Sequence, residues 1–239
     1  MGNAPRLLVG TSGFSYKAWK GSFYPKDLPP GKLLSYYAEK MPAVEINNTF
    51  YRMPQRTVMA KWRTQVPPEF RFVLKAPRRI THHSRLKDAG DSLLYLLDVA
   101  AELGDTLGAL LFQLPPYLKK DVVRLREFCS LLPRQPKAAF EFRHQSWFDD
   151  EVFTVLADAD ASLCIADAGA EDRDAPWVAT ASWGYLRLRR ENYEEADLAS
   201  WAERIDSESW SDAYVFFKHE EAGVGPKLAA QLLDAYGSA

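Results

Sequence analysis

Apolar residues follow two patterns along the chain, and the two patterns alternate. Eight short runs are almost continuously apolar, and longer segments with apolar residues at helical spacing separate them and follow the last one. Short, continuously apolar runs are typical of strands covered on both faces. The predicted strands span residues 6–12, 43–47, 71–77, 108–116, 138–144, 162–169, 184–190 and 213–221. The predicted helices span residues 32–41, 58–66, 91–104, 122–132, 150–160, 197–205 and 227–237.

This alternation predicts crossover connections and a parallel sheet. Eight strand–helix units in 239 residues fit a closed (β/α)₈ TIM-type barrel, which typically needs about 250 residues. Only the link at 171–183 lacks a convincing helical pattern. An open doubly wound sheet is the alternative, but "GTSGFSY" at 10–16 does not match its glycine-rich phosphate turn. No linker or low-complexity segment divides the chain, so residues 1–239 are expected to form one domain.

Composition narrows the class of protein. A net charge of −2 provides no overall basic field, which argues against general nucleic-acid binding but leaves room for a local basic pocket. The start "MGNAPRLLVG" lacks the features of a signal peptide, and no apolar run approaches the length of a membrane span. Cys129 and Cys164 do not form a CxxC pair and are expected to be reduced. A cytoplasmic protein without a membrane segment is therefore expected.

Polar side chains gather at the ends of the predicted strands, and in a barrel those ends form the functional face. Glu45 and Glu141 lie inside apolar runs, where an ionised carboxylate is costly unless it is paired and hydrogen-bonded. The polar residues at strand ends are Ser12, Glu45, Asn47, Lys75, Gln113, Glu141, Arg143, Asp167, Arg187, Arg189 and Lys218. All four histidines, His82, His83, His144 and His219, also follow strands. This distribution predicts a site at one end of the barrel.

The acid/base candidates are Glu141, Glu45 and, third, Asp167. Glu45 is expected to have a structural role, because Lys75 on the neighbouring strand would neutralise it. Glu141 is favoured for chemistry, because its nearest expected neighbours are Gln113 and another acid, Asp167, which would raise its pKa. If Arg143 folded back onto Glu141, that pKa would fall instead. For each acid, a purely structural ion pair is the competing interpretation.

A small anionic molecule is the expected ligand, because the cations at the strand ends outnumber the two glutamates. Aromatic residues in the loops would close over it, although ordinary packing would explain them equally well. The expected binding residues are Ser12, Tyr16, Trp19, Asn47, Tyr51, Lys75, His82, Gln113, Arg143, Trp147, Arg187 and His219. No cofactor is predicted. A divalent metal is not favoured, because no HxH, HExxH or DxD spacing is present and cations occupy the same face.

Five ordered motifs resemble those of the YecE-like family of bacterial and archaeal proteins. They are "VGTSGFSYKAWKGSFYP", "VEINNTFYRMP", "FVLKAPRRITHHSRL", "LGALLFQLPP" and "FEFRHQSWF". The resemblance runs from about residue 9 to residue 233 and implies a TIM barrel, but it supplies no established reaction. The chain departs from the family's commoner form after the seventh and eighth predicted strands. There it carries Arg189, Arg190, His219 and Glu220.

The resulting hypothesis is an enzyme that uses acid/base chemistry on a small phosphorylated or carboxylate substrate. A barrel that binds nucleic acid or processes a phosphodiester is one alternative. A non-catalytic binding or scaffold barrel is the other, and it would have both glutamates consumed in ion pairs. The substrate and the oligomeric state do not follow from the sequence.

Overall fold

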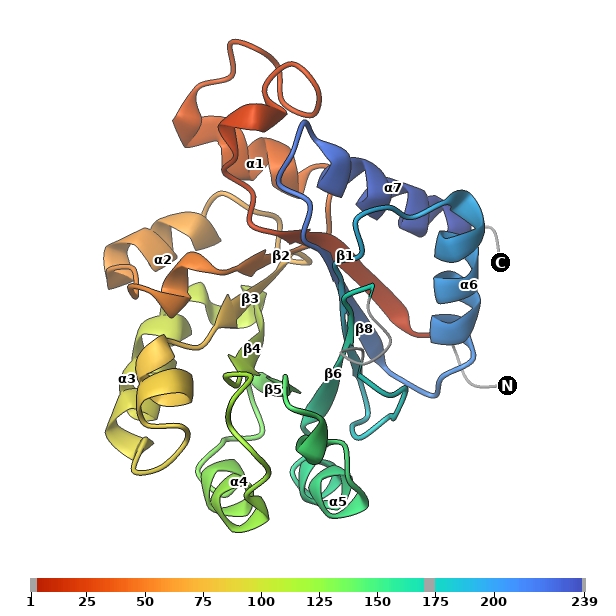
Figure 1. Cartoon of the computed structure of the whole chain (residues 1–239). Helices are drawn as coiled ribbons and strands as arrows, with labels where there is room; N and C mark the ends of the chain where they lie inside the picture. The colour runs from red at the N-terminus through yellow and green to blue at the C-terminus, as the bar shows by residue number, and fades with distance from the viewer. Residues whose placement is uncertain (1–3, 170–174, 238–239) are drawn as a thin grey trace.

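Eight parallel strands close into a barrel in the computed structural model, which describes residues 4–169 and 175–237 (Figure 1). Each strand pairs with the next along the chain, and β8 closes the ring on β1 from Arg6↔Asp212 to Thr11↔Phe217. The strands are β1 (Arg6–Ser12), β2 (Ala43–Ile46), β3 (Arg71–Lys75), β4 (Leu107–Gln113), β5 (Lys137–Glu141), β6 (Ser162–Asp167), β7 (Gly184–Leu188) and β8 (Asp212–Phe217). The predicted TIM-type barrel is therefore confirmed.

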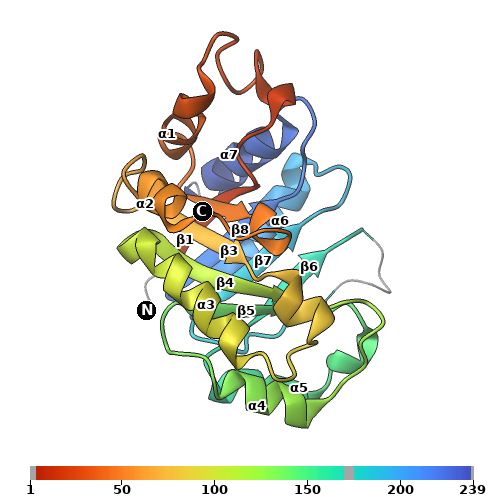
Figure 2. The same cartoon turned by 90° about the vertical axis from the view of Figure 1, so that its left-hand side faces the viewer.

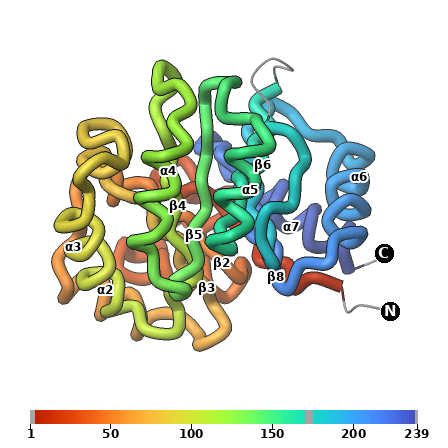
Figure 3. The backbone as a smooth tube through the Cα atoms, turned by 90° about the horizontal axis from the view of Figure 1, so that it is seen from below, coloured from red at the N-terminus to blue at the C-terminus, as the bar shows by residue number. Residues whose placement is uncertain are grey.

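The α-helices lie outside the strands, as Figures 1 and 2 show, and the view from below in Figure 3 shows the same arrangement. They are α1 (Leu33–Ala38), α2 (Arg56–Arg63), α3 (Gly90–Ala100), α4 (Val122–Cys129), α5 (Asp150–Asp158), α6 (Glu195–Asp206) and α7 (Val224–Gly237). Between β6 and β7, residues 175–183 contain no helix, in line with the sequence pattern, and 171–174 lie outside the described residues. No helix in the described part of the chain is both long and apolar enough to cross a membrane.

Short helical turns follow several strands and carry candidate residues. They are the 3₁₀ turns η1 (Lys17–Trp19), η2 (Pro30–Lys32), η3 (Asn48–Phe50), η5 (Ala101–Thr106) and η6 (Gln145–Trp147), and the π turn η4 (Arg79–His83). Of these, η1, η3, η4 and η6 follow β1, β2, β3 and β5 respectively. The aromatic and histidine side chains of the motifs therefore lie near the carboxyl ends of the strands.

The barrel interior is filled by side chains of very unequal size. Alanines on β2, β4 and β5 leave space that aromatic side chains of β7 and β8 fill, since successive residues of a strand alternate between the two faces. The buried interior cluster is Leu8, Ala43, Val73, Ala109, Leu111, Ala139, Cys164, Ala166, Trp183, Tyr185, Tyr214 and Phe216. At the amino end, Asp212 accepts from Lys137 at 2.5 Å and from Arg6 at 2.9 Å. A packed apolar layer therefore separates the polar groups at the carboxyl end of the barrel from the ion pairs of Asp212 at the amino end.

The hydroxyl of Tyr37, on α1, joins β1 to β2. It accepts from the Thr11 amide at 2.8 Å and donates to the Ala43 carbonyl oxygen at 3.0 Å. Gly10 makes this approach possible, because a Cβ there would lie 1.9 Å from the Ala43 carbonyl oxygen and 2.9 Å from the Tyr37 hydroxyl. A side chain from the helix layer therefore satisfies backbone groups of two strands.

Replacing Tyr37 by Phe should lower the free energy of unfolding by about 1–3 kcal/mol, because the Thr11 amide would lose a buried partner. The measurement is chemical denaturation. Tyr36→Phe is the matched control, since the Tyr36 hydroxyl makes no hydrogen bond within residues 4–169 and 175–237. Equal stabilities of the two variants would contradict the role given to the Tyr37 hydroxyl.

Candidate functional site

One guanidinium group pairs with both buried glutamates. Arg187 lies inside the barrel on β7 and is 2% exposed, while Glu45 and Glu141 are 0% and 1% exposed. The Arg187 Nη2 donates to Glu45 Oε1 at 2.8 Å, and its Nη1 donates to Glu141 Oε2 at 2.6 Å. The two carboxylates that looked unexplained in the sequence therefore share one cation, which comes from a strand that is not a neighbour of either.

Glu45 is held in its ionised form. Its Oε1 also accepts from Ser12 Oγ at 2.7 Å and Asn47 Nδ2 at 3.1 Å, and its Oε2 accepts from the Tyr185 hydroxyl at 2.5 Å. Burial alone would raise the pKa of Glu45, but the charge of Arg187 and these hydrogen bonds outweigh it and lower that pKa. Tyr185 was not among the predicted site residues. It shares the inward face with Arg187, two residues away, and this spacing could have revealed it.

Glu141 is ionised as well, which corrects the expectation of a raised pKa. Besides Arg187, it accepts from Gln113 Nε2 at 2.9 Å and pairs with Arg189 Nη2 at 3.2 Å. Burial opposes ionisation, yet the charges of Arg187 and Arg189 lower the pKa of Glu141 to about 2. A carboxylate with so low a pKa is a poor proton donor or acceptor at neutral pH.

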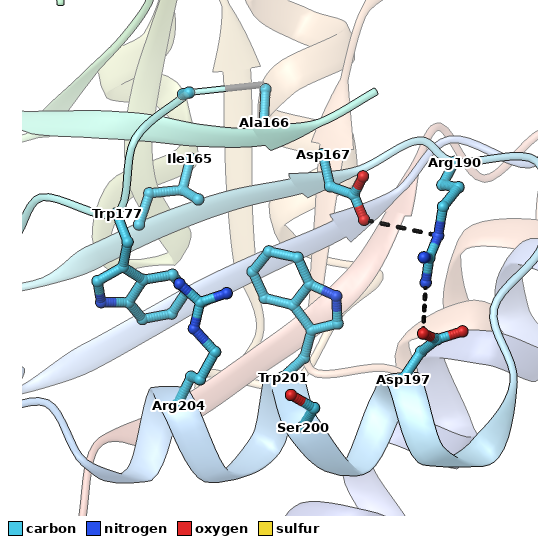
Figure 4. Close-up of a pocket in the computed structure, with 10 residues that line it drawn as sticks. Ile165, Ala166, Asp167, Trp177, Arg190, Asp197, Ser200, Trp201 and Arg204 are labelled. Atoms are coloured by element: carbon cyan, nitrogen blue, oxygen red, sulfur yellow. Dashed lines mark ion pairs between the residues drawn. The ribbon is translucent and has the colours of Figure 1, made fainter. Parts of the chain in front are cut away.

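Asp167 does not lie beside Glu141, and Figure 4 shows why. Ala166 faces the barrel interior, so the next side chain on β6 points outward, toward α6. There Asp167 Oδ2 accepts from the Tyr193 hydroxyl at 2.9 Å and lies 3.9 Å from Arg190 Nε. The residue pattern does not indicate this orientation, because β6 is apolar on both faces. Asp167 therefore cannot raise the pKa of Glu141 in the way expected.

Lys75 does not pair with Glu45, which is a second correction. In the register of β2 with β3, Glu45 lies opposite Val73, so Lys75 is two residues farther toward the carboxyl end. Its Nζ instead donates to Gln113 Oε1 at 2.8 Å and lies 4.4 Å from the centre of the Phe50 ring. Burial, followed by the positive charge of Arg187, lowers the pKa of Lys75 to about 8.

Further cations surround these groups at the carboxyl end. Arg143 and Lys218 are exposed, and no carboxylate in the described part of the chain pairs with either of them or with Lys75. His82 packs edge-on against Phe50, with ring centres 4.9 Å apart. Burial and the charge of Lys75 lower the pKa of His82.

A cavity of about 730 Å³ opens beside β7 and β8. Its lining residues are Ala168, Arg189, Glu191, Asn192, Lys218, His219, Glu220, Glu221 and Val224. Most of these belong to the two segments in which the sequence departs from the family's commoner form. His219 Nε2 donates to the Arg190 carbonyl oxygen at 2.8 Å, so His219 also fixes the neighbouring loop.

The predicted aromatic lid is largely part of the protein's own packing. Trp19 is buried and donates to the Glu220 carbonyl oxygen at 3.0 Å, and Trp147 is buried and donates to the Leu118 carbonyl oxygen at 2.7 Å. Tyr16 donates to the Ser12 carbonyl oxygen at 2.6 Å. Of the four predicted aromatics only Tyr51, 73% exposed, is free to contact a ligand broadly. The other three hold the loops in place.

A smaller cavity, about 290 Å³, lies beside β1 and β2 and includes Ser12, Tyr16 and Asn47 in its lining. The Asn47 Oδ1 is buried and has no hydrogen-bond partner among the described residues. The Asn47 Oδ1 is therefore available to a hydrogen-bond donor of a ligand.

No group of three or more His, Cys, Asp or Glu side chains able to hold a metal ion occurs among residues 4–169 and 175–237.

Comparisons with known proteins agree with this architecture. The family model described as "Protein of unknown function DUF72" matches residues 8–239. A solved DUF72 family protein from Thermotoga maritima is similar, with a TM-score of 0.82 and 26% identity over 96% of this chain and 98% of that one.

Two curated relatives are similar over part of their length. UPF0759 protein YunF of Bacillus subtilis is 30% identical over 135 residues, which is 53% of this chain and 48% of that protein. UPF0759 protein YecE of Escherichia coli is 31% identical over 116 residues, which is 48% of this chain and 43% of that protein. The chain therefore spans about half the length of the curated relatives it matches.

Glu45→Gln and Glu141→Gln should each lower the free energy of unfolding at pH 7 by about 3–5 kcal/mol, because each leaves the buried Arg187 with one carboxylate fewer. The native pKa of Glu141 is below its ordinary value, so its stabilisation is complete above pH 4.5 and is lost as the pH falls toward about 2. The difference between the wild type and Glu141→Gln should shrink over that range. Denaturant unfolding at several pH values measures it.

Arg56→Met is the control for a surface pair. Arg56 pairs with Asp98 and, at 3.1 Å, with Glu102 on the exposed side of α2, so solvent screens the pairs and its loss should lower stability much less than either glutamate change does. A glutamate variant no less stable than this control would show that Arg187 does not depend on both carboxylates.

Lys75 should make stability rise with pH in the alkaline range. Because its native pKa is lowered from 10.5 to about 8, the unfolded chain holds a proton between these values that the native protein has released. The free energy of unfolding should therefore increase from pH 8 to 10.5, and Lys75→Met should remove that increase. Buried tyrosines also titrate, so the quantity to measure is the difference between the two proteins. A constant difference across this range would contradict the lowered pKa.

Proposed function

The chain belongs to the DUF72 family of proteins of unknown function, and from the site itself we propose that it is an enzyme acting by acid/base chemistry on a small anionic substrate. The observation that supports this most is the charge balance at the carboxyl end of the barrel. Arg187 takes up Glu45 and Glu141, and Lys75, Arg143 and Lys218 are left without a carboxylate among the described residues. Clustered cations without counter-ions favour an anionic ligand.

The anionic group is expected beside Arg189 and Lys218, at one part of the larger cavity. Elsewhere the same cavity carries Glu191, Glu220 and Glu221, which would repel it. Arg189 is held by Glu141 at 3.2 Å, so its guanidinium is positioned before a ligand arrives. A phosphate or a carboxylate would suit this pair.

Lys75 is the proposed proton donor and acceptor, in place of Glu141. A catalytic acid or base works best when its pKa is close to the working pH, and the pKa of Lys75 is lowered to about 8, whereas that of Glu141 is about 2. In this proposal Glu45 and Glu141 are positioning residues that hold Arg187 and Arg189. His82, whose ring packs on the same Phe50, lies within the same group.

A non-catalytic binding barrel is the second candidate, and one observation favours it. Both glutamates are consumed in ion pairs, as expected for a barrel whose polar groups serve its own stability. A ligand that binds at the carboxyl end and is never converted would support this candidate over the enzyme.

Inorganic phosphate should raise the melting temperature more than chloride does at matched ionic strength. Binding to the native state adds about 2.7 kcal/mol to the free energy of unfolding at a hundredfold excess over the dissociation constant. Arg143→Gln and Lys218→Gln should each reduce the phosphate-specific shift, because each removes an unpaired cation.

Lys61→Gln is the charge-matched control. Lys61 lies in the last turn of α2, which leads back to the amino end of the barrel, so its loss should leave the phosphate effect unchanged. Equal shifts in phosphate and chloride, or equal losses in all three variants, would contradict a specific anion site.

A further inference from the structure

Lys75 differs from the other lysines whose Nζ has a defined contact, because it is half-buried and has no carboxylate partner among the described residues. Lys20 also donates to a neutral oxygen, the Leu28 carbonyl at 2.9 Å, but Lys20 is exposed. Lys137 contacts Asp212 at 2.5 Å and Lys120 contacts Asp149 at 2.9 Å, so both have a carboxylate that favours the charged ammonium. Lys75 Nζ contacts the neutral amide oxygen of Gln113 at 2.8 Å. An amide oxygen can accept a hydrogen bond from an ammonium group, which gives the stronger bond, or from a neutral amine. This partner therefore orients the Lys75 nitrogen without requiring it to be charged.

The orientation of the Gln113 amide is fixed by its other contact. Its Nε2 donates to Glu141 Oε2 at 2.9 Å, and this carboxylate oxygen also accepts from Arg187 Nη1 at 2.6 Å. Because a carboxylate can only accept there, the amide oxygen must be the atom that faces Lys75. Gln113 thus links Lys75 to the central ion pairs while adding no negative charge to it.

The surroundings of Lys75 favour a neutral, nucleophilic amine. The side chain is half-buried at the carboxyl end of β3. The Phe50 ring lies 4.4 Å from Nζ, and this contact favours the ammonium form, so it acts against deprotonation. Burial and the positive charges of Arg187 and Lys218 lower its pKa to about 8, although Glu141 and Glu45 act in the opposite sense. Desolvation beside other cations is a recognised way to activate a lysine for attack on a carbonyl group.

We propose that Lys75 Nζ forms a covalent imine with a carbonyl compound that carries a phosphate or carboxylate group. This inference rests on the proposed function, since the cations at the carboxyl end of the barrel would hold the anionic group. It adds the substrate class, an anionic aldehyde, ketone or 2-oxo acid, and gives Lys75 a nucleophilic role as well as a proton-transfer role.

The reaction balances without an oxidant or a reductant. The Nζ lone pair attacks the carbonyl carbon, the C=O π electrons move to oxygen, and a proton passes from nitrogen to oxygen to give a carbinolamine. The hydroxyl group then leaves as water with a proton from solvent, and nitrogen forms the C=N bond. The protonated imine keeps one N–H group. This group can donate to Gln113 Oε1, the same atom to which the Lys75 nitrogen donates in the free protein.

Pyridoxal 5′-phosphate, an aldehyde with a phosphate group, is the probe, and sodium borohydride makes the imine permanent. Intact mass and peptide mapping should show one label per chain, at Lys75. Labelling should be at least about tenfold faster than at exposed lysines, because more of the Lys75 amine is neutral near pH 7.5. Inorganic phosphate should slow labelling at Lys75. Pyridoxal without the phosphate should label it more slowly.

Lys75→Arg should abolish the label, and Lys61→Arg, the same change at an exposed position of α2, should leave it intact. Glyoxylate with cyanoborohydride, tested in the same way, decides whether a carboxylate can replace the phosphate. Peptide mapping of the wild-type protein decides the question even if Lys75→Arg fails to fold.

Labels spread over many lysines, or a mapped site other than Lys75, would overturn the proposal. If phosphate raises the melting temperature while Lys75 stays unlabelled, the imine is wrong and the anion site stands. If phosphate has no specific effect and Lys75 stays unlabelled, both proposals are wrong.

Discussion

The shared guanidinium of Arg187 is the interaction on which the carboxyl end of the barrel depends. Two carboxylates that are almost completely buried would be prohibitively costly without a cation. Arginine can serve both because its planar fork presents separate N–H groups, and here Nη2 faces Glu45 while Nη1 faces Glu141. The contacts join β7 to β2 and β5 across the barrel interior. The site is therefore held by charge pairing between strands that are not neighbours in the ring.

This pairing determines what the remaining polar groups can do. Arg187 pairs with both glutamates, and the register of β2 with β3 keeps Lys75 away from Glu45, so Lys75 donates to Gln113 instead. The lysine is left with a lowered pKa and an oriented nitrogen, which are the properties of a reactive amine. The pairing of Arg187 with both glutamates thus neutralises their charges inside the barrel and also leaves Lys75 with a lowered pKa at the carboxyl end.

The barrel was predictable because its signals are local and repeated. Eight continuously apolar strands, most of them with polar ends, alternate with or precede seven segments of helical period, and each repeat supports the others. The partners of the charged residues were less predictable. Whether Lys75 reaches Glu45 depends on the register of β2 with β3. The outward orientation of Asp167 could not be predicted, because the two faces of β6 are equally apolar. Trp19 and Trp147 follow predicted strands, so in the sequence they resemble lid residues. Their burial results from the packing of the loops on the barrel, which the sequence pattern does not show.

The pKa of Lys75 reports whether Arg187 pairs with both glutamates and leaves Lys75 without a carboxylate partner. Carbon-13 NMR of lysine labelled at Cε can follow each lysine through a pH titration, and Lys75→Arg assigns the resonance. We expect a pKa of about 8 for Lys75, because burial and the Arg187 charge act on an amine that has no carboxylate of its own. A pKa near the ordinary value of 10.5 or above would contradict this arrangement, since it would show that a glutamate neutralises Lys75.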